Sequence, residues 1–264
     1  MKTYIFLFFL IFFLVISGYQ NILNASAEEN PCLKCHVKLQ QPAKHIHAAL
    51  KTGCEVCHTK EEGKNHPDDK KSIKLTQNMP NLCYSCHEAS KFKGTVVHAP
   101  IMGGMCTSCH DPHQSDNPKI LKEPIPEVCY TCHDKAKFTR KYVHKVINVI
   151  GCGTCHNPHA SNNPALLPSS KTEICISCHK SQASGTHVVS IPGKRFHPIK
   201  GVKDPSTLKW IQAPDPKNPK RMIEIPDPNV PGEELTCVSC HDPHSSDYQK
   251  LFTAQRICLK CHKY

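Results

Sequence analysis

One short pattern takes up every cysteine in this chain of 264 residues. Cys-x-x-Cys-His occurs nine times, so that no cysteine is left over and no pair lacks its histidine. The paired cysteines are Cys32/Cys35, Cys54/Cys57, Cys83/Cys86, Cys106/Cys109, Cys129/Cys132, Cys152/Cys155, Cys175/Cys178, Cys237/Cys240 and Cys258/Cys261. The histidines that follow them are His36, His58, His87, His110, His133, His156, His179, His241 and His262. Whatever these side chains bind constrains the fold at nine places.

The spacing inside the motif matches the chemistry of covalent haem attachment. Two thiols separated by two residues can form thioethers with the two vinyl groups of one haem, and the next residue can bind its iron. Disulfides would explain an even number of cysteines, but they give no reason for a histidine after every second one. Structural zinc sites would tolerate other residues at that position. The pattern therefore predicts nine covalently attached haems c.

Six-coordinate haem iron needs a second axial ligand, usually His or Met. Ten histidines outside the motifs are available for this role: His45, His47, His66, His98, His113, His144, His159, His187, His197 and His244. Met79, Met102 and Met105 also lie near motifs, but the histidines suffice in number and we interpret these methionines as packing residues. We therefore expect mostly low-spin haems with two histidine ligands.

The free histidines follow a repeat. The first cysteines of five successive motifs, from Cys83 to Cys175, are spaced 23 residues apart. Some motifs continue as Cys-His-x-Pro-His, which places a free histidine three residues on; these are His113, His159 and His244. Plain motifs are followed eleven residues later by a histidine, as in His87 to His98 and His133 to His144. The repeat predicts two-motif units in which each free histidine precedes a motif.

Four such units can be placed along the chain, and in each a free histidine is expected to serve the motif that follows it. They are His45 or His47 with Cys54 and His66 with Cys83; His98 with Cys106 and His113 with Cys129; His144 with Cys152 and His159 with Cys175; and His197 with Cys237 and His244 with Cys258. The Cys32 motif remains single, with His187 or the spare of His45 and His47 as its partner. A free histidine can also reach a neighbouring unit.

The first residues predict export. Lys2, thirteen apolar residues over 4–16 and the sequence Ala25-Ser26-Ala27 form the three parts of a secretory signal peptide, here residues 1–27. Thirteen residues of helix reach about 20 Å, too short for a hydrocarbon core of about 30 Å, so we expect cleavage and not a membrane anchor. The sequence therefore predicts a periplasmic or extracellular protein.

Composition predicts a mostly irregular fold with short α-helices and little regular β structure. Five of the nine phenylalanines lie in the predicted signal, 22 prolines interrupt the chain, and Trp210 is its only tryptophan. Such a chain cannot offset its ordering entropy by burying its own side chains, so haem must fill the interior. We expect a three-haem segment at 28–100, a four-haem segment at 101–186 and a two-haem segment at 187–264, with a proline-rich insertion at 203–235. The insertion is either a surface excursion or a docking element.

At these motifs the chain resembles the multihaem c-type cytochromes of the doubled CXXCH type, over residues 32–262. The resemblance implies an electron carrier of anaerobic or extracellular respiration, with bis-histidine haems stacked in an elongated chain and no catalytic residue. The nine motifs and the insertion depart from the familiar members. One alternative is a reductase of nitrite, hydroxylamine or sulfite, with its open iron at the Cys32 motif. Another is a subunit of an extracellular cytochrome filament or an outer-membrane conduit.

The formal charge of +11 does not predict nucleic-acid binding, because eighteen haem propionates would turn it to about −7. The resemblance implies redox partners instead: a quinol-oxidising membrane complex, other cytochromes or a terminal reductase. A homo- or hetero-oligomer through exposed haem edges is a further possibility that it implies. Two imidazole ligands predict a lower potential than a His/Met pair, since Met raises the potential.

Overall fold

The structure is a computed structural model that describes residues 30–184, 187 and 197–262. The predicted signal peptide lies outside these residues. The described residues divide into two compact units, one of residues 30–76 with 112–116 and the other of the described residues in 77–111 and 117–262. This division does not test the predicted segments of three, four and two haems, which stay a prediction. No helix within the described residues is long and apolar enough to cross a membrane.

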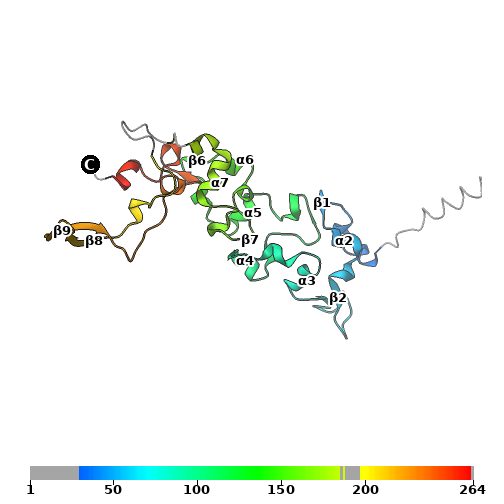
Figure 1. Cartoon of the computed structure of the whole chain (residues 1–264). Helices are drawn as coiled ribbons and strands as arrows, with labels where there is room; N and C mark the ends of the chain where they lie inside the picture. The colour runs from blue at the N-terminus through cyan, green and yellow to red at the C-terminus, as the bar shows by residue number, and fades with distance from the viewer. Residues whose placement is uncertain (1–29, 185–186, 188–196, 263–264) are drawn as a thin grey trace, which may run out of the picture. The chain divides into compact units, whose positions relative to one another are not determined.

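Short helices carry the motifs, as composition predicted (Figure 1). The α-helices are α2 (Ala48–Thr52), α3 (Asn81–Tyr84), α4 (Ala99–Met102), α5 (Glu127–Tyr130), α6 (Val146–Val149) and α7 (Lys171–Cys178). The motifs at Cys83, Cys129 and Cys175 begin within α3, α5 and α7, whereas the other six begin in 3-10 turns, at Cys32, Cys54, Cys106, Cys152, Cys237 and Cys258. A serine and a glutamate cap α7 reciprocally, which stabilises the start of the longest helix.

Within the part of the chain that the structure describes, five two-stranded antiparallel sheets join segments that are mostly distant in sequence. The strands are β1 (His45–Ile46), β2 (His58–Lys60), β3 (Ile73–Leu75), β4 (Val96–Val97), β5 (Gln114–Ser115), β6 (Tyr142–Val143), β7 (Ala160–Ser161), β8 (Trp210–Asp215), β9 (Asn218–Pro226) and β10 (Ser245–Ser246). β1 pairs with β5, β4 with β7 and β6 with β10, so the segment before a free histidine meets the segment that follows Cys-His-x-Pro-His. These strand pairs place the histidines.

The insertion contains the longest sheet. β8 and β9 form a hairpin in which Ile211 faces Ile225 and Ala213 faces Ile223. Alternating β-branched residues favour a strand, and Asp215 accepts a hydrogen bond from the Lys217 amide in the turn. Sequence analysis left this segment without regular structure because its prolines obscured the alternation.

Few apolar side chains are buried by the chain itself. Among the described residues the buried apolar ones are Leu121, Val128, Ile147, Ala160, Leu167 and Leu235, all in the second unit. Large apolar side chains remain open, with Val149 exposed to 78% and Met102 to 70%. A polypeptide core of this size agrees with the expectation that the chain does not fill its own interior.

Candidate functional site: nine Cys-x-x-Cys-His motifs and their histidine partners

Eight of the nine motifs close a helical turn that brings their three functional side chains to one face. The His36 amide donates to the Cys32 carbonyl at 3.0 Å, and the His87 amide to the Cys83 carbonyl at 2.8 Å, as in one turn of helix. Side chains at positions i, i+3 and i+4 of such a turn point to the same side. The two thiols and the imidazole of such a motif can therefore bind the same group.

The second cysteines of the motifs alternate between exposed and half-buried positions from Cys35 to Cys240. Cys57 is half-buried, and its carbonyl accepts a hydrogen bond from the Thr76 amide at 2.9 Å. Cys86 is exposed, and the Ser85 hydroxyl donates to its thiol at 3.9 Å. No disulfide joins any of the 18 cysteines, all of which lie within the described residues. The thioethers expected at Cys57 and Cys86 stay a prediction.

Motif histidines and free histidines form ring pairs. Eight pairs have ring centroids 5.8 to 6.2 Å apart. Within the first unit they are His36–His66 and His58–His113. Within the second they are His98–His133, His110–His159, His144–His179, His156–His244, His187–His241 and His197–His262. Two imidazoles that bind one metal ion from opposite sides, through bonds of about 2 Å, have centroids about 6 Å apart.

The angle between the paired rings divides the pairs into classes. In six of them the ring planes lie within 28° of each other. The His187–His241 planes meet at 48° and the His197–His262 planes at 74°. The two wider angles belong to the last two motifs, around the insertion.

The pairing corrects the order expected from the repeat. His113 lies beside His58, and not beside the histidine of the Cys129 motif; His159 and His244 likewise turn back to His110 and His156. His98 and His144 pass over the motif that follows them and reach the next one. The cause is the antiparallel pairing of β4 with β7 and of β6 with β10. Each of these strand pairs joins one two-motif repeat to the next.

The histidine partner expected for the Cys32 motif is also corrected. Its His36 lies beside His66, with planes only 3° apart, whereas His187 lies beside His241. His66 belongs to the loop between β2 and β3, and its Nδ1 is 3.0 Å from the hydroxyl of the buried Ser72. The hairpin after the second motif therefore brings His66 to the first. His197 pairs with His262, and not with the histidine of the Cys237 motif.

His47 occupies the same setting as His98 and His144. Its Nδ1 lies 2.8 Å from the Pro112 carbonyl, and its amide donates to the His113 carbonyl at 2.9 Å. The Nδ1 atoms of His98 and His144 lie 2.8 and 2.9 Å from the carbonyls of Pro158 and Pro243. A carbonyl must accept Nδ1–H, so that Nε2 is left to bind metal. His45 instead belongs to β1, opposite Ser115.

Each Cys-His-x-Pro-His loop therefore serves two histidines. Its last histidine turns toward one motif, and its proline carbonyl orients the free histidine of another. The residue at x fixes the loop, since Asn157 and Asp242 accept hydrogen bonds from the amides of His159 and His244 at 3.0 and 2.9 Å. Such short turns are typical of Asn and Asp. Sequence analysis recognised the motif without the function of its proline carbonyl.

A second group of carbonyls was missed altogether. Nδ1 of His110, His156 and His241 lies 2.7 to 2.9 Å from the carbonyl nine residues later in the chain. Those carbonyls belong to Lys119, Ala165 and Lys250, each the first of two consecutive residues with positive φ. Left-handed backbone is uncommon outside glycine and is retained where it serves a site. The signal that sequence analysis overlooked is the repeated apolar residue ten positions after each of these histidines, Ile120, Leu166 and Leu251.

Neighbouring motifs meet through their thiols. Hydrogen bonds link Cys32 with Cys54, Cys129 with Cys152 and Cys175 with Cys237. Closely spaced second cysteines interact electrostatically in Cys109–Cys132, Cys155–Cys178 and Cys240–Cys261. From Cys106 to Cys261, each motif thus neighbours the next in sequence order. The hydrogen bond with Cys129 lowers the pKa of Cys152 to about 7, and that with Cys175 lowers the pKa of Cys237 to about 6.

Burial lowers the pKa of several of the imidazoles. It is the main cause of the lowered pKa of His58, His159, His187 and His244, and a neighbouring histidine adds to it in each case. A metal-binding histidine must be unprotonated at the binding nitrogen, so a lowered pKa favours the ligand form.

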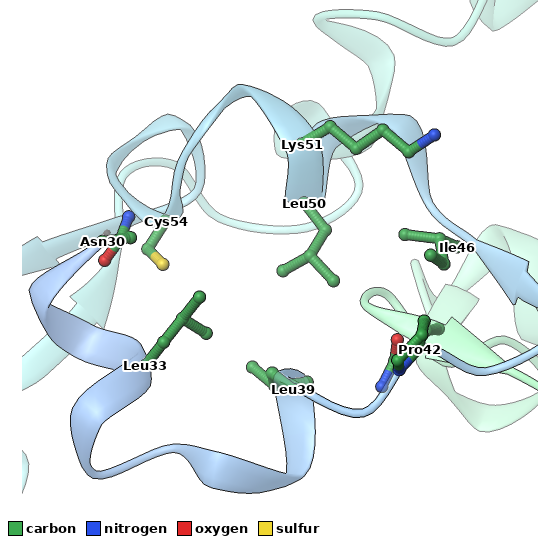
Figure 2. A pocket seen from close by; sticks show the side chains of 9 residues that line it. Asn30, Leu33, Leu39, Pro42, Ile46, Leu50, Lys51 and Cys54 are labelled. Carbon is green, nitrogen blue, oxygen red and sulfur yellow. The ribbon is translucent and has the colours of Figure 1, made fainter. Parts of the chain in front are cut away.

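An apolar pocket of about 170 Å³ lies beside Cys54 in the first unit (Figure 2). Leu33, Leu39 and Leu50 point into it, while the thiol of Cys54 lies at its side. This apolar lining beside a motif cysteine suits contact with one edge of a porphyrin.

Comparison with known proteins agrees with these motifs. The model of the doubled CXXCH motif family matches residues 47–92, 98–138, 144–184 and 229–264, more than half of the chain. The chain belongs to the doubled CXXCH family of multihaem c-type cytochromes. A search of curated proteins returned no match. Each of the four matches covers two motifs, as the repeat predicted, and the first three begin at His47, His98 and His144.

Haem c fits the residues of this cytochrome. Every motif offers two thiols for thioethers and an imidazole, and each ring pair has the separation that one iron between two imidazoles requires. Thiols that can form thioethers with the porphyrin and neutral imidazoles that can bind its iron are the groups that covalent haem requires. Haem c supplies reversible one-electron chemistry when it is bound, and the chain supplies its ligands and surroundings.

Proposed function

We propose that this cytochrome carries nine haems c and relays electrons along them. The observation that supports it best is the combination of paired imidazoles with motifs that adjoin one another in sequence order, from Cys106 to Cys261. Sites held side by side in this way suit electron transfer from one to the next. Two axial imidazoles also saturate the iron, which favours a carrier over an enzyme.

The ninth ligand follows from the repeat. Eight ring pairs account for sixteen of the nineteen histidines. Of His45 and His47, only His47 has the proline-carbonyl hydrogen bond that His98 and His144 have, and the first family match begins at it. We assign His47 as a ligand and His45 as the spare histidine.

An oxyanion reductase is the weaker alternative. It requires an iron with one open face, and the Cys32 motif was the expected place for it. His66 lies 6.1 Å from His36 by ring centroids, at the distance of a second ligand. The proposed carrier therefore has no need of an open iron at this motif.

The setting of the relay is also proposed. The signal at residues 1–27 favours the periplasm or the cell exterior, where c-type haem is attached, and paired imidazoles favour low potentials suited to anaerobic respiration. A quinol-oxidising complex or another cytochrome would deliver electrons, and a terminal reductase or further cytochromes would accept them. A filament or conduit subunit would differ by forming assemblies after secretion.

Two measurements on the secreted protein test the proposal. The intact mass should equal residues 28–264 plus nine haems, and the reduced protein should bind no carbon monoxide, because every iron has two imidazoles. A smaller haem count would contradict the relay of nine. Stoichiometric carbon monoxide binding to one iron would instead favour the reductase.

A further inference from the structure

The insertion is anchored beside the last two motifs. The Leu235 amide donates to the Val202 carbonyl at 2.8 Å, and the Asp204 amide to the Glu233 carbonyl at 2.9 Å. Asp204 is 3% exposed, and its carboxylate lies 3.7 Å from the thiol of Cys261. The hairpin therefore rises from an ordered base at the Cys258/Cys261 motif, which distinguishes it from a tolerated loop.

One face of the hairpin presents apolar side chains to solvent. Trp210, the only tryptophan of the chain, is 47% exposed, and Met222 on the other strand is 55% exposed. Pro214, opposite Met222, and Pro226, opposite Trp210, lie on the same exposed face, with the polar pair Gln212–Glu224 between them. β8 and β9 contact mainly each other, and Figure 1 shows the two strands side by side as a hairpin. Exposed Trp and Met in an ordered element are typical of protein interfaces.

The turn of the hairpin is cationic. Lys217, Lys220 and Arg221 are all exposed within five positions, and residues 209–226 hold four cations against two carboxylates. If nine haems make the whole protein about −7, this positive patch differs in sign from the molecule that carries it. Opposite charges speed encounter and select the partner's surface.

We propose that the β8–β9 hairpin docks a redox protein with an acidic surface at the Cys258/Cys261 end of the chain. Lys217, Lys220 and Arg221 attract the partner, and Trp210 with Met222 forms the apolar contact that holds it. The inference rests on the proposed electron relay, since it assigns the site where that relay exchanges electrons with another protein.

Protein-film voltammetry of the haem-loaded mature chain tests the electrostatic part. The probe is gold coated with a carboxylate-terminated monolayer, compared with a hydroxyl-terminated one. Lys217→Glu with Lys220→Glu should slow electron exchange on carboxylate about tenfold at low salt, and added salt should remove the difference. Lys70→Glu with Lys71→Glu, exposed in the first unit and equal in charge change, is the control and should have little effect. Equal losses in both variants would overturn the proposal.

Trp210→Ala tests the apolar contact. On a mixed film of carboxylate and methyl ends it should lower the exchange rate about threefold, and on pure carboxylate it should change little. Unchanged exchange on both films would contradict the apolar contact. Vesicles of anionic phospholipid that retain the protein through Lys217 and Lys220 would assign the surface to a membrane and so overturn the proposal. Intact haem mass and solution reduction in all variants separate these outcomes from failure of the relay itself, which would abolish exchange on every film.

Discussion

At the scale of single residues, the sequence predicted which cysteines and histidines could bind haem, but it did not predict which histidines form pairs. Nine motifs and ten free histidines identify the chemistry because haem attachment demands that spacing. Which imidazole faces which depends on strands of two residues, such as Val96–Val97 against Ala160–Ser161, and these are too short to leave a sequence signal. His113 and His58, which the repeat assigned to different two-motif repeats, form a ring pair within the first compact unit.

The assignment of His47 leads to a direct test. His47→Ala should leave one iron in nine with a single imidazole, because Nδ1 of His47 is held by the Pro112 carbonyl as a ligand's is. That iron becomes high-spin and binds carbon monoxide when reduced, which a difference spectrum measures as about one ninth of the haem. His45→Ala is the matched control and should leave every iron low-spin. The reverse result, with carbon monoxide binding only in His45→Ala, would exchange the two roles.

The angle of the His197–His262 pair predicts a distinct spectrum. Perpendicular imidazoles interact almost equally with two iron d orbitals, so a ferric haem held by rings near 74° gives a highly anisotropic low-spin resonance. The six pairs within 28° give the ordinary rhombic signal.

Electron paramagnetic resonance of the oxidised protein checks this. His197→Ala should abolish the anisotropic signal, whereas His144→Ala, whose pair has planes at 28°, should reduce only the rhombic one. Loss of rhombic intensity alone in His197→Ala would contradict the assigned geometry.

At the scale of elements, the sequence predicted short helices, but it did not predict the left-handed turns whose carbonyls orient the motif histidines. α3, α5 and α7 fit a chain rich in proline and poor in periodic apolar residues. The pairs of residues with positive φ that begin at Lys119, Ala165 and Lys250 contain no glycine. The sequence therefore has no typical turn residue that would predict them. The β8–β9 hairpin escaped prediction for a related reason, since prolines at 214, 216 and 219 suggested a loop.

Gly151, directly before the Cys152 motif, is an element-scale test. Its φ of 77° suits glycine, and an added Cβ would lie 2.5 Å from Cγ2 of Ile125. Gly151→Ala should therefore destabilise the haem-loaded protein by about 1–3 kcal/mol, seen as a lower Tm. Gly153→Ala, two residues on, would meet nothing within 4 Å and should change the Tm little. Equal Tm values for the two variants would show that this turn tolerates a side chain.

At the scale of the whole molecule, the main feature is that the chain buries few apolar side chains, as its composition predicted. Six apolar residues are buried in the described chain, and side chains as large as Val149 and Met102 stay open. That amount of burial is far too small to offset the ordering entropy of more than two hundred residues. Composition could foresee the shortage, whereas the division at residues 76 and 77 depends on long-range contacts that composition does not encode.

The same shortage predicts that folding requires haem. Residues 28–264 produced without haem attachment should show the circular dichroism of an unfolded chain and be cleaved rapidly by protease, because the interior that the histidine pairs surround would be missing. The haem-loaded form should resist protease and melt cooperatively. Loss of a single haem, through Cys32→Ser with Cys35→Ser, should leave the second unit protected, since that motif lies in the first. A haem-free chain that melts cooperatively with native dichroism would mean that the polypeptide has a core of its own.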